Sequence, residues 1–151
     1  MLRRESFSYT VQARCAPVVA AALLADPLQQ VELHPLMVRV RRLPPASGAR
    51  ASYAITDQLA VGRLRFPIAY RADVLVADPD EVVTVARQWP ATTVRNRTRL
   101  SADPDGVRID VEVTVAAPAS LFGYVFAQAR SAHLALGSRL GAVLAADPPS
   151  V

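Results

Sequence analysis

Six segments with strand character follow one another from residue 37 to residue 115, and this succession constrains the fold more than any other feature of the chain. The turns between them are short and contain glycine, proline and aspartate, as at Gly62, Pro90 and 103–106. A parallel pair of strands needs a long crossover connection, which such turns cannot provide. The sequence therefore predicts an antiparallel meander, with strands at residues 37–42, 51–59, 64–76, 82–89, 93–100 and 107–115.

A further strand and three helical segments are predicted outside the meander. Residues 7–13 alternate between apolar and polar side chains, which indicates an N-terminal strand. Pro17 favours the start of a short helix that ends before Pro27, and a second helical turn is expected at 28–33. Apolar residues at three- and four-residue spacing over 121–144 predict a long C-terminal helix. The expected fold class is α+β, a curved antiparallel sheet of about seven strands with two short helices and one long helix.

Length and composition favour one folded domain. Of the 151 residues, 52% are hydrophobic and 20% are charged, and no long polar or low-complexity tract interrupts them. We expect a single domain over residues 1–146 and a flexible tail at 147–151, where proline and polar residues follow the last helix.

The charged and metal-binding residue types argue against several classes of function. All 17 basic residues are arginine, but they are spread along the chain rather than set beside aromatic residues, so nucleic-acid binding is not expected. Cys15 is the only cysteine, and with two scattered histidines neither a metal site nor an intramolecular disulfide is predicted. The apolar run at 16–25 is too short for a membrane span and lacks a signal-peptide cleavage site. These features predict a cytoplasmic protein without stable membrane insertion and leave a homodimer open.

The strands at 93–100 and 107–115 can be paired from the sequence. If Leu100 faces Val107 across the turn, Asn96 and Thr98 fall on the apolar face of the sheet. Charged residues then meet on the other face, in the pairs Arg95–Glu112 and Arg97–Asp110.

The order of these elements resembles the START-like superfamily (SRPBCC), which includes the birch-pollen allergen (Bet v 1-like) fold and the polyketide cyclase/dehydrase and lipid-transport proteins. The features that carry the resemblance are Phe7-Ser8-Tyr9-Thr10-Val11, Ala16-Pro17-Val18-Val19, His34-Pro35 and Ala117-Pro118. The resemblance covers nearly the whole chain. It implies a helix-grip domain in which the terminal helix lies across the concave sheet above a cavity. Members include aromatases and cyclases that fold poly-β-ketone chains, and carriers of lipids, sterols and hormones.

Candidate ligand-binding residues follow from the alternation along each strand. The residues expected to line the cavity are Tyr53, Ile55, Trp89, Asn96 and Thr98 from the strands, Phe122, Phe126 and Ala129 from the helix, and His34. Asn96 and Thr98 either hold a ligand oxygen or water, or satisfy each other at a wet sheet edge. Asp57 is interpreted as an exposed cap near a strand end.

Candidate catalytic residues are His133, Arg87 and Tyr70. His133 is suited to proton transfer near neutral pH, although a lone histidine on an apolar face is also typical of a packed, hydrogen-bonded side chain. Arg87 is expected on the same face as Val83 and Val85, where it either reaches the cavity or is solvated at the strand end. No nucleophile elbow, phosphate loop, zinc pair or dinucleotide motif is present, so an enzyme of this sequence would use no cofactor and no covalent intermediate.

Three functional readings remain. The first is a protein that binds a polyketide- or lipid-like molecule and performs cofactor-free cyclisation or dehydration, with Tyr53, Tyr70, Arg87 or Asn96 holding carbonyl oxygens and His133 moving protons. The second is a non-catalytic carrier or sensor. Convergent titratable groups in the cavity would favour the enzyme, and an entirely apolar lining would favour the carrier. The third, an interaction protein with a filled core, predicts no cavity.

Overall fold

A computed structural model describes residues 1–31 and 37–145, apart from the side chains of residues 59–61, 141–143 and 145. The strands are β1 (Leu2–Ala13), β2 (Met37–Leu43), β3 (Ala51–Val61), β4 (Leu64–Ala77), β5 (Glu81–Gln88), β6 (Thr92–Asp103) and β7 (Gly106–Pro118), and the helices are α1 (Pro17–Leu24), α2 (Pro27–Gln30) and α3 (Ala119–Ala145). The predicted α+β fold class and the order of its elements are confirmed. His34 and the predicted tail at 147–151 lie outside the described residues.

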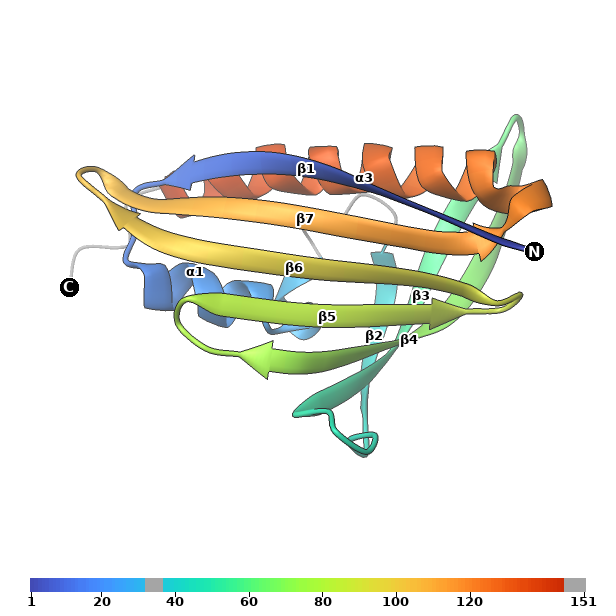
Figure 1. The fold of residues 1–151 in the computed structure, drawn as a ribbon, viewed down its shortest axis with the longest axis horizontal. Helices are drawn as coiled ribbons and strands as arrows, with labels where there is room; N and C mark the ends of the chain where they lie inside the picture. Colours follow the sequence, from blue (N-terminus) through green and yellow to red (C-terminus); the bar gives the residue numbers. More distant parts are fainter. Residues whose placement is uncertain (32–36, 146–151) are drawn as a thin grey trace.

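The seven strands form one antiparallel sheet in the order β1-β7-β6-β5-β4-β3-β2. The short turns pair each strand from β2 to β7 with its successor, and β1 then joins the free edge of β7. Figure 1 shows β1, β7, β6 and β5 running side by side, while β2, β3 and β4 turn away at one end. This turn makes the sheet concave on the side that the helices occupy.

The pairing of β6 with β7 differs from the prediction by two residues. A tight turn pairs Asp103 with Gly106, so Asn96 lies opposite Val113 and Thr98 opposite Val111. Gly106 has φ of 145°, and a side chain there would collide with the Ala13 backbone.

Because side chains alternate with period two, a shift of two residues leaves every side chain of these strands on its predicted face. The expected pairs Arg95–Glu112 and Arg97–Asp110 are nevertheless wrong. Arg97 lies opposite Glu112 and forms an ion pair of 2.9 Å with Glu81 of β5.

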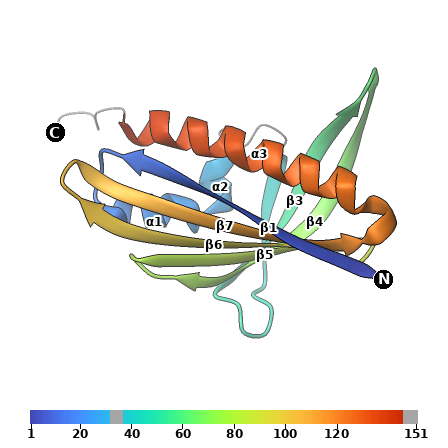
Figure 2. The same ribbon diagram turned by 45° about the horizontal axis from the view of Figure 1, so that its top comes forward.

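Helix α3 packs mainly against β1 and β7. Phe122 and Leu140 on α3 are buried with Ile109 and Val113 of β7, which forms the main core. Figure 2 shows α3 running along the sheet, with β3 and β4 extending past its first turn. Since the helix lies over one side of a concave sheet, space remains between it and the strands that curve away. None of the helices among the described residues has the length and apolarity that a membrane crossing requires.

Candidate functional site

Two adjoining pockets lie between the inner face of the sheet and α3. Pocket A, beneath the first half of α3, has a volume of about 160 Å³, and pocket B, beneath its second half and beside α2, has about 110 Å³. Tyr70, Ala86, Val94 and His133 line both. Together the pockets fall below the roughly 300 Å³ at which ligand sites usually begin. An apolar cavity of roughly 150 Å³ can bind benzene, so pocket A has room for about one aromatic ring.

Pocket A joins an apolar lining to a group of titratable side chains. Its apolar part includes Ile68 and Val94 from the sheet and Ala129 and Ala132 from α3. Its titratable side chains are Asp57, Tyr70, Tyr124 and His133, and its neutral polar ones are Gln88, Thr92 and Gln128. The strands and α3 therefore direct polar groups into one small apolar space, an arrangement typical of ligand-binding and catalytic sites.

Asp57 and Tyr70 form a hydrogen-bonded pair on neighbouring strands. In the β3–β4 ladder Asp57 lies opposite Ile68 and Tyr70 opposite Ile55, so both side chains fall on the inner face. The Tyr70 hydroxyl donates to Asp57 Oδ1 at 3.3 Å. Burial raises the pKa of Asp57 to about 6, and the hydrogen bond from Tyr70 opposes this shift only in part. Burial, together with the nearby carboxylate, raises the pKa of Tyr70 well above its ordinary value. The prediction that Asp57 is an exposed cap is therefore wrong.

His133 faces this pair from α3 and also contacts the aromatic side chains of β1. Its Nδ1 lies 3.5 Å from the Tyr9 hydroxyl, and its ring lies 6.0 Å from the Phe7 ring in an edge-on arrangement. Burial raises the pKa of Tyr9 to about 12, so this phenol stays protonated at neutral pH. The imidazole is thus held by packing against β1 while it lines both pockets.

Pocket B is also mostly apolar, and two of its polar side chains pair with each other. Its lining includes Met37, Ile55, Val74 and Leu136. Thr98 Oγ1 donates to Asn96 Oδ1 at 2.8 Å, and both residues line the pocket. Of the two alternatives considered from the sequence, the hydrogen bond supports the one in which these residues satisfy each other, although they face the pocket from an inner strand rather than a sheet edge.

The sequence predicted that Val83 and Val85 lie on the inner face of β5, but the opposite face of the strand lines the pockets. Thr84, Ala86 and Gln88 line the pockets, whereas Arg87 points to the outer side of the sheet. Arg87 Nη1 donates to Asp73 Oδ2 at 2.9 Å, and Trp89 is 88% exposed in the turn that follows. The structure thus leaves Arg87 and Trp89 outside the cavity.

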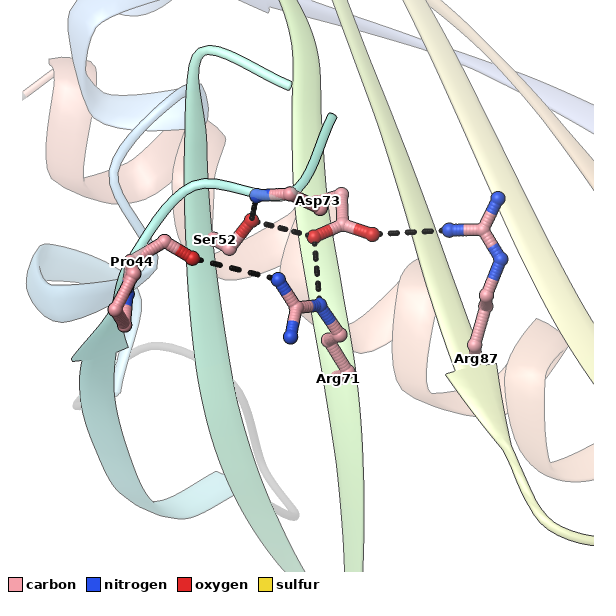
Figure 3. Close-up of polar contacts among 6 residues, drawn as sticks. Pro44, Ser52, Arg71, Asp73 and Arg87 are labelled. Atoms are coloured by element: carbon pink, nitrogen blue, oxygen red, sulfur yellow. Dashed lines mark hydrogen bonds and ion pairs between the residues drawn. The ribbon is translucent and has the colours of Figure 1, made fainter. Parts of the chain in front are cut away.

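Asp73 is the centre of a polar cluster on the outer side of β3, β4 and β5, which Figure 3 shows. The carboxylate is 4% exposed and accepts hydrogen bonds from Ser52 (2.6 Å), Arg71 (3.0 Å) and Arg87 (2.9 Å). Burial by itself would raise the pKa of Asp73, but the hydrogen bonds from Ser52 and Arg71 and the two guanidinium charges together lower it. Ser52 also accepts from the backbone N–H of Ala46, so the cluster fixes the β2–β3 connection.

Other predicted ligand-binding residues lie in the core. Phe122 is fully buried and stacks on Phe126 at 5.4 Å, and Phe126 meets Phe7 edge-on at 5.6 Å. Tyr53 packs in a second core cluster with Met37 and Ile55. Of the residues selected from the sequence, Ile55, Tyr70, Asn96, Thr98, Ala129 and His133 line the pockets. Within residues 1–31 and 37–145, no three His, Cys, Asp or Glu side chains gather as metal ligands would.

Solved structures with this arrangement of elements are known. The di-domain ARO/CYC proteins StfQ, of the steffimycin biosynthetic pathway, and BexL, of the BE-7585A pathway, match with TM-scores of 0.74 and 0.73 at 12% and 15% identity. The matches cover 94% and 97% of this chain. Ara h 8.0201 matches with a TM-score of 0.61 at 15% identity, over 91% of this chain and 98% of that one. The chain has the START-like, Bet v 1-like fold.

The chain spans about half the length of the two ARO/CYC proteins, 50% of StfQ and 51% of BexL. A norcoclaurine synthase of Thalictrum, in complex with a transition state analogue, matches with a TM-score of 0.67 at 8% identity, over 95% of this chain and 96% of that one. No protein-family model and no curated protein matches the sequence. At these identities the likeness establishes the fold alone.

Several residues that line pockets A and B were missed from the sequence. Tyr124, Gln128 and Ala132 lie on α3 at positions that face the sheet, and the helical spacing that selected Ala129 and His133 could also have indicated Ala132. Gln88 was missed because the phase of β5 was assigned incorrectly, and Thr92 was missed because the predicted strand began one residue later, at residue 93. Tyr9 was recognised as a strand residue, but nothing in the sequence indicates its contact with His133.

Proposed function

We propose that this chain binds a small hydrophobic molecule, polyketide-like or lipid-like in its carbon skeleton, in pockets A and B. The observation that carries the proposal is the convergence of Asp57, Tyr70 and His133, from three different elements, on one mostly apolar cavity. An apolar skeleton would fill the space between Ile68, Val94 and α3, and a polar group of the ligand would lie against the three titratable side chains.

We also propose that the bound molecule undergoes cofactor-free acid–base chemistry of the aromatase/cyclase type. A carboxylate with a pKa of about 6 is mostly ionised at neutral pH and is a stronger base than an ordinary aspartate, so Asp57 is suited to removing a proton from a carbon beside a carbonyl. The imidazole of His133 is placed to donate to that carbonyl oxygen, and Tyr70, which donates its one hydroxyl proton to Asp57, would orient the carboxylate. Similarity to two ARO/CYC proteins supports this choice of chemistry.

In the cyclisation, the deprotonated carbon forms a bond to a second carbonyl carbon of the same molecule. The second carbonyl oxygen takes up a proton, and loss of that hydroxyl with a neighbouring proton, as water, completes the dehydration. The carbon–carbon bond formation and the loss of water are redox-neutral, and only protons pass between the ligand and the protein, so no oxidant is required. Such chemistry suits the cytoplasmic location that the sequence predicts.

A non-catalytic carrier or sensor is the second candidate. Pocket B favours it, because its polar residues Asn96 and Thr98 are already paired and the rest of its lining is largely apolar. A carrier needs the cavity but not the basicity of Asp57.

The binding proposal is tested by filling the cavity. Ala86 lines both pockets, so Ala86→Leu should occlude them, whereas Ala69→Leu adds the same side chain at an exposed position of β4 and serves as the control. Native mass spectrometry should detect a small apolar molecule, co-purified or added, with the wild type and Ala69→Leu but not with Ala86→Leu. Equal retention by both variants would contradict the proposed site.

The catalytic proposal is tested by deuterium exchange into a ketone of suitable size. With 1-phenyl-2-propanone in D₂O, NMR should show faster exchange of the benzylic protons with wild-type protein than with Asp57→Asn. Binding without any acceleration would eliminate the catalytic proposal and favour the carrier.

A further inference from the structure

The chain carries 17 arginines, yet none is among the described residues that line pocket A or pocket B. Arginines on the central strands point to the outer side of the sheet, where Arg71 and Arg87 bind Asp73 and Arg97 binds Glu81. The described lining of the two pockets therefore does not share the excess of positive charge, +4, that the whole chain carries.

Asp57 determines the charge of pocket A. Among the described residues, the titratable groups that line the pocket with it are Tyr70 from β4 and Tyr124 and His133 from α3, and β5 and β6 contribute neutral side chains, which include Gln88 and Thr92. A ligand carboxylate placed here would meet the Asp57 carboxylate, and no arginine or lysine among the described lining residues would offset the repulsion. A ligand cation would instead compensate the burial of Asp57, and the tyrosine rings are favourable neighbours for it.

We propose that the natural ligand carries a basic nitrogen, bound as an ammonium group against Asp57, and that pocket A excludes carboxylates such as fatty acids. This proposal rests on the binding function proposed above and names the polar group of the ligand. It assigns Asp57 to binding in place of the role as base, because a carboxylate that is paired with an ammonium group is less basic. The volume of about 160 Å³ limits the enclosed part of the ligand to about one aromatic ring with a short side chain.

Three probes of nearly equal size separate the polar group from the apolar skeleton: 2-phenylethylamine, 2-phenylethanol and phenylacetate. Binding to the full chain is measured by NMR titration of ¹³C-labelled alanine methyl groups, because Ala86, Ala129 and Ala132 line pocket A and report where each probe binds. At pH 7.5 the amine should bind at least about tenfold more tightly than the alcohol, as charge-assisted hydrogen bonds are the stronger ones. Phenylacetate should not shift these methyl groups.

Asp57→Asn is the matched variant, because it keeps the shape and the acceptor oxygen but removes the charge. The variant should bind the amine and the alcohol with similar affinity. In the wild type the affinity for the amine should fall as the pH decreases from 7.5 to 5, since Asp57 becomes protonated. The dependence should be weaker in Asp57→Asn, which lacks this carboxylate.

The outcomes distinguish the two proposals. If the amine and the alcohol bind the wild type equally, if phenylacetate binds as well as either, or if Asp57→Asn keeps the full preference and pH dependence, the assignment of a basic nitrogen is overturned while the cavity remains a binding site. If no probe shifts the three alanine methyl groups, the proposed binding function itself fails.

Discussion

At the scale of single residues, one carboxylate organises the outer side of the sheet. Asp73 lies opposite Ser52 on β3, and Arg71 and Arg87 lie opposite each other on β4 and β5. Without the carboxylate, two guanidinium groups would face one another across the ladder, which is unfavourable for like charges. Asp73 therefore offsets the repulsion between Arg71 and Arg87, and it also accepts hydrogen bonds from its neighbours.

We expect Asp73→Asn to lower the free energy of unfolding by about 2 kcal/mol. Loss of a partner from a fully buried ion pair costs roughly 3 to 5 kcal/mol, but here the arginine side chains are 41% and 56% exposed, so solvent screens part of the effect. The control is Glu81→Gln, which removes the more exposed ion pair to Arg97 and should change stability by less than about 0.5 kcal/mol. Urea denaturation measures both, and equal effects of the two substitutions would refute this account.

The sequence predicts the face on which a polar residue lies better than it predicts the partner of that residue. Asn96 and Thr98 were placed correctly because each lies within a clear alternation. Asp57 was misjudged because its partner, Tyr70, comes from the next strand, and burial of the pair depends on α3. A contact between residues far apart in the chain leaves no periodic signal in either segment.

At the scale of elements, two glycines of α3 differ in their surroundings. A methyl group on Gly137 would lie 2.8 Å from Cε2 of Tyr9, which packs beside His133, whereas one on Gly123 would have nothing within 4 Å. Gly137 thus permits α3 to approach β1 closely, and Gly123 has no such role.

The substitution Gly123→Ala should raise the free energy of unfolding by about 0.5 to 1 kcal/mol, because alanine is the better helix former. Gly137→Ala gains the same propensity but must displace the Tyr9 ring, so we expect a net loss of about 1 kcal/mol. Thermal denaturation of both variants provides the measurement. A stabilised Gly137→Ala would mean that Tyr9 moves freely and that the contact of α3 with β1 is loose.

In β5 the alternation of apolar and polar residues does not identify the face that lines the cavity. Val83 and Val85 are only 3% and 6% exposed although they lie on the outer side of β5, and the inner side is lined by Thr84 and Ala86. When both faces of a strand are buried, apolarity no longer identifies the inner one. The register shift between Val74 and Val76 adds a bulge in β4 that no feature of the sequence indicates.

At the scale of the whole molecule, the architecture could be predicted because each hairpin is formed by residues that are close together in the sequence. Short turns imposed the antiparallel order, and the spacing of apolar residues defined α3. The volume and polarity of the cavity could not be predicted, because they depend on how far the concave sheet curves away from a helix that packs on β1 and β7. These quantities arise from contacts between elements rather than within them.

The Asp57 side chain links this cavity to the stability of the entire fold. Its pKa is about 6 in the folded protein, above the ordinary value near 3.9 for an unfolded chain. The folded state therefore binds more protons than the unfolded state between these values, so the contribution of Asp57 to stability is present below pH 4 and is lost as the pH rises through 6. Asp73 and Asp110, whose pKa values are lowered, act in the opposite direction under acidic conditions.

We expect Asp57→Asn to be more stable than the wild type by about 1 to 2 kcal/mol at pH 7.5, since it removes a partly buried charge and keeps an acceptor for Tyr70. At pH 4 the two proteins should differ little, because Asp57 is then protonated in the folded state. Urea denaturation at pH 4, 5.5 and 7.5 gives the difference directly, and the contributions of Asp73 and Asp110 cancel in it. A gain of the same size at all three pH values would show that packing, rather than the charge of Asp57, limits stability. A gain confined to neutral pH would identify Asp57 as a group held ionised in the cavity at a cost to the fold, as expected of a residue that serves the ligand.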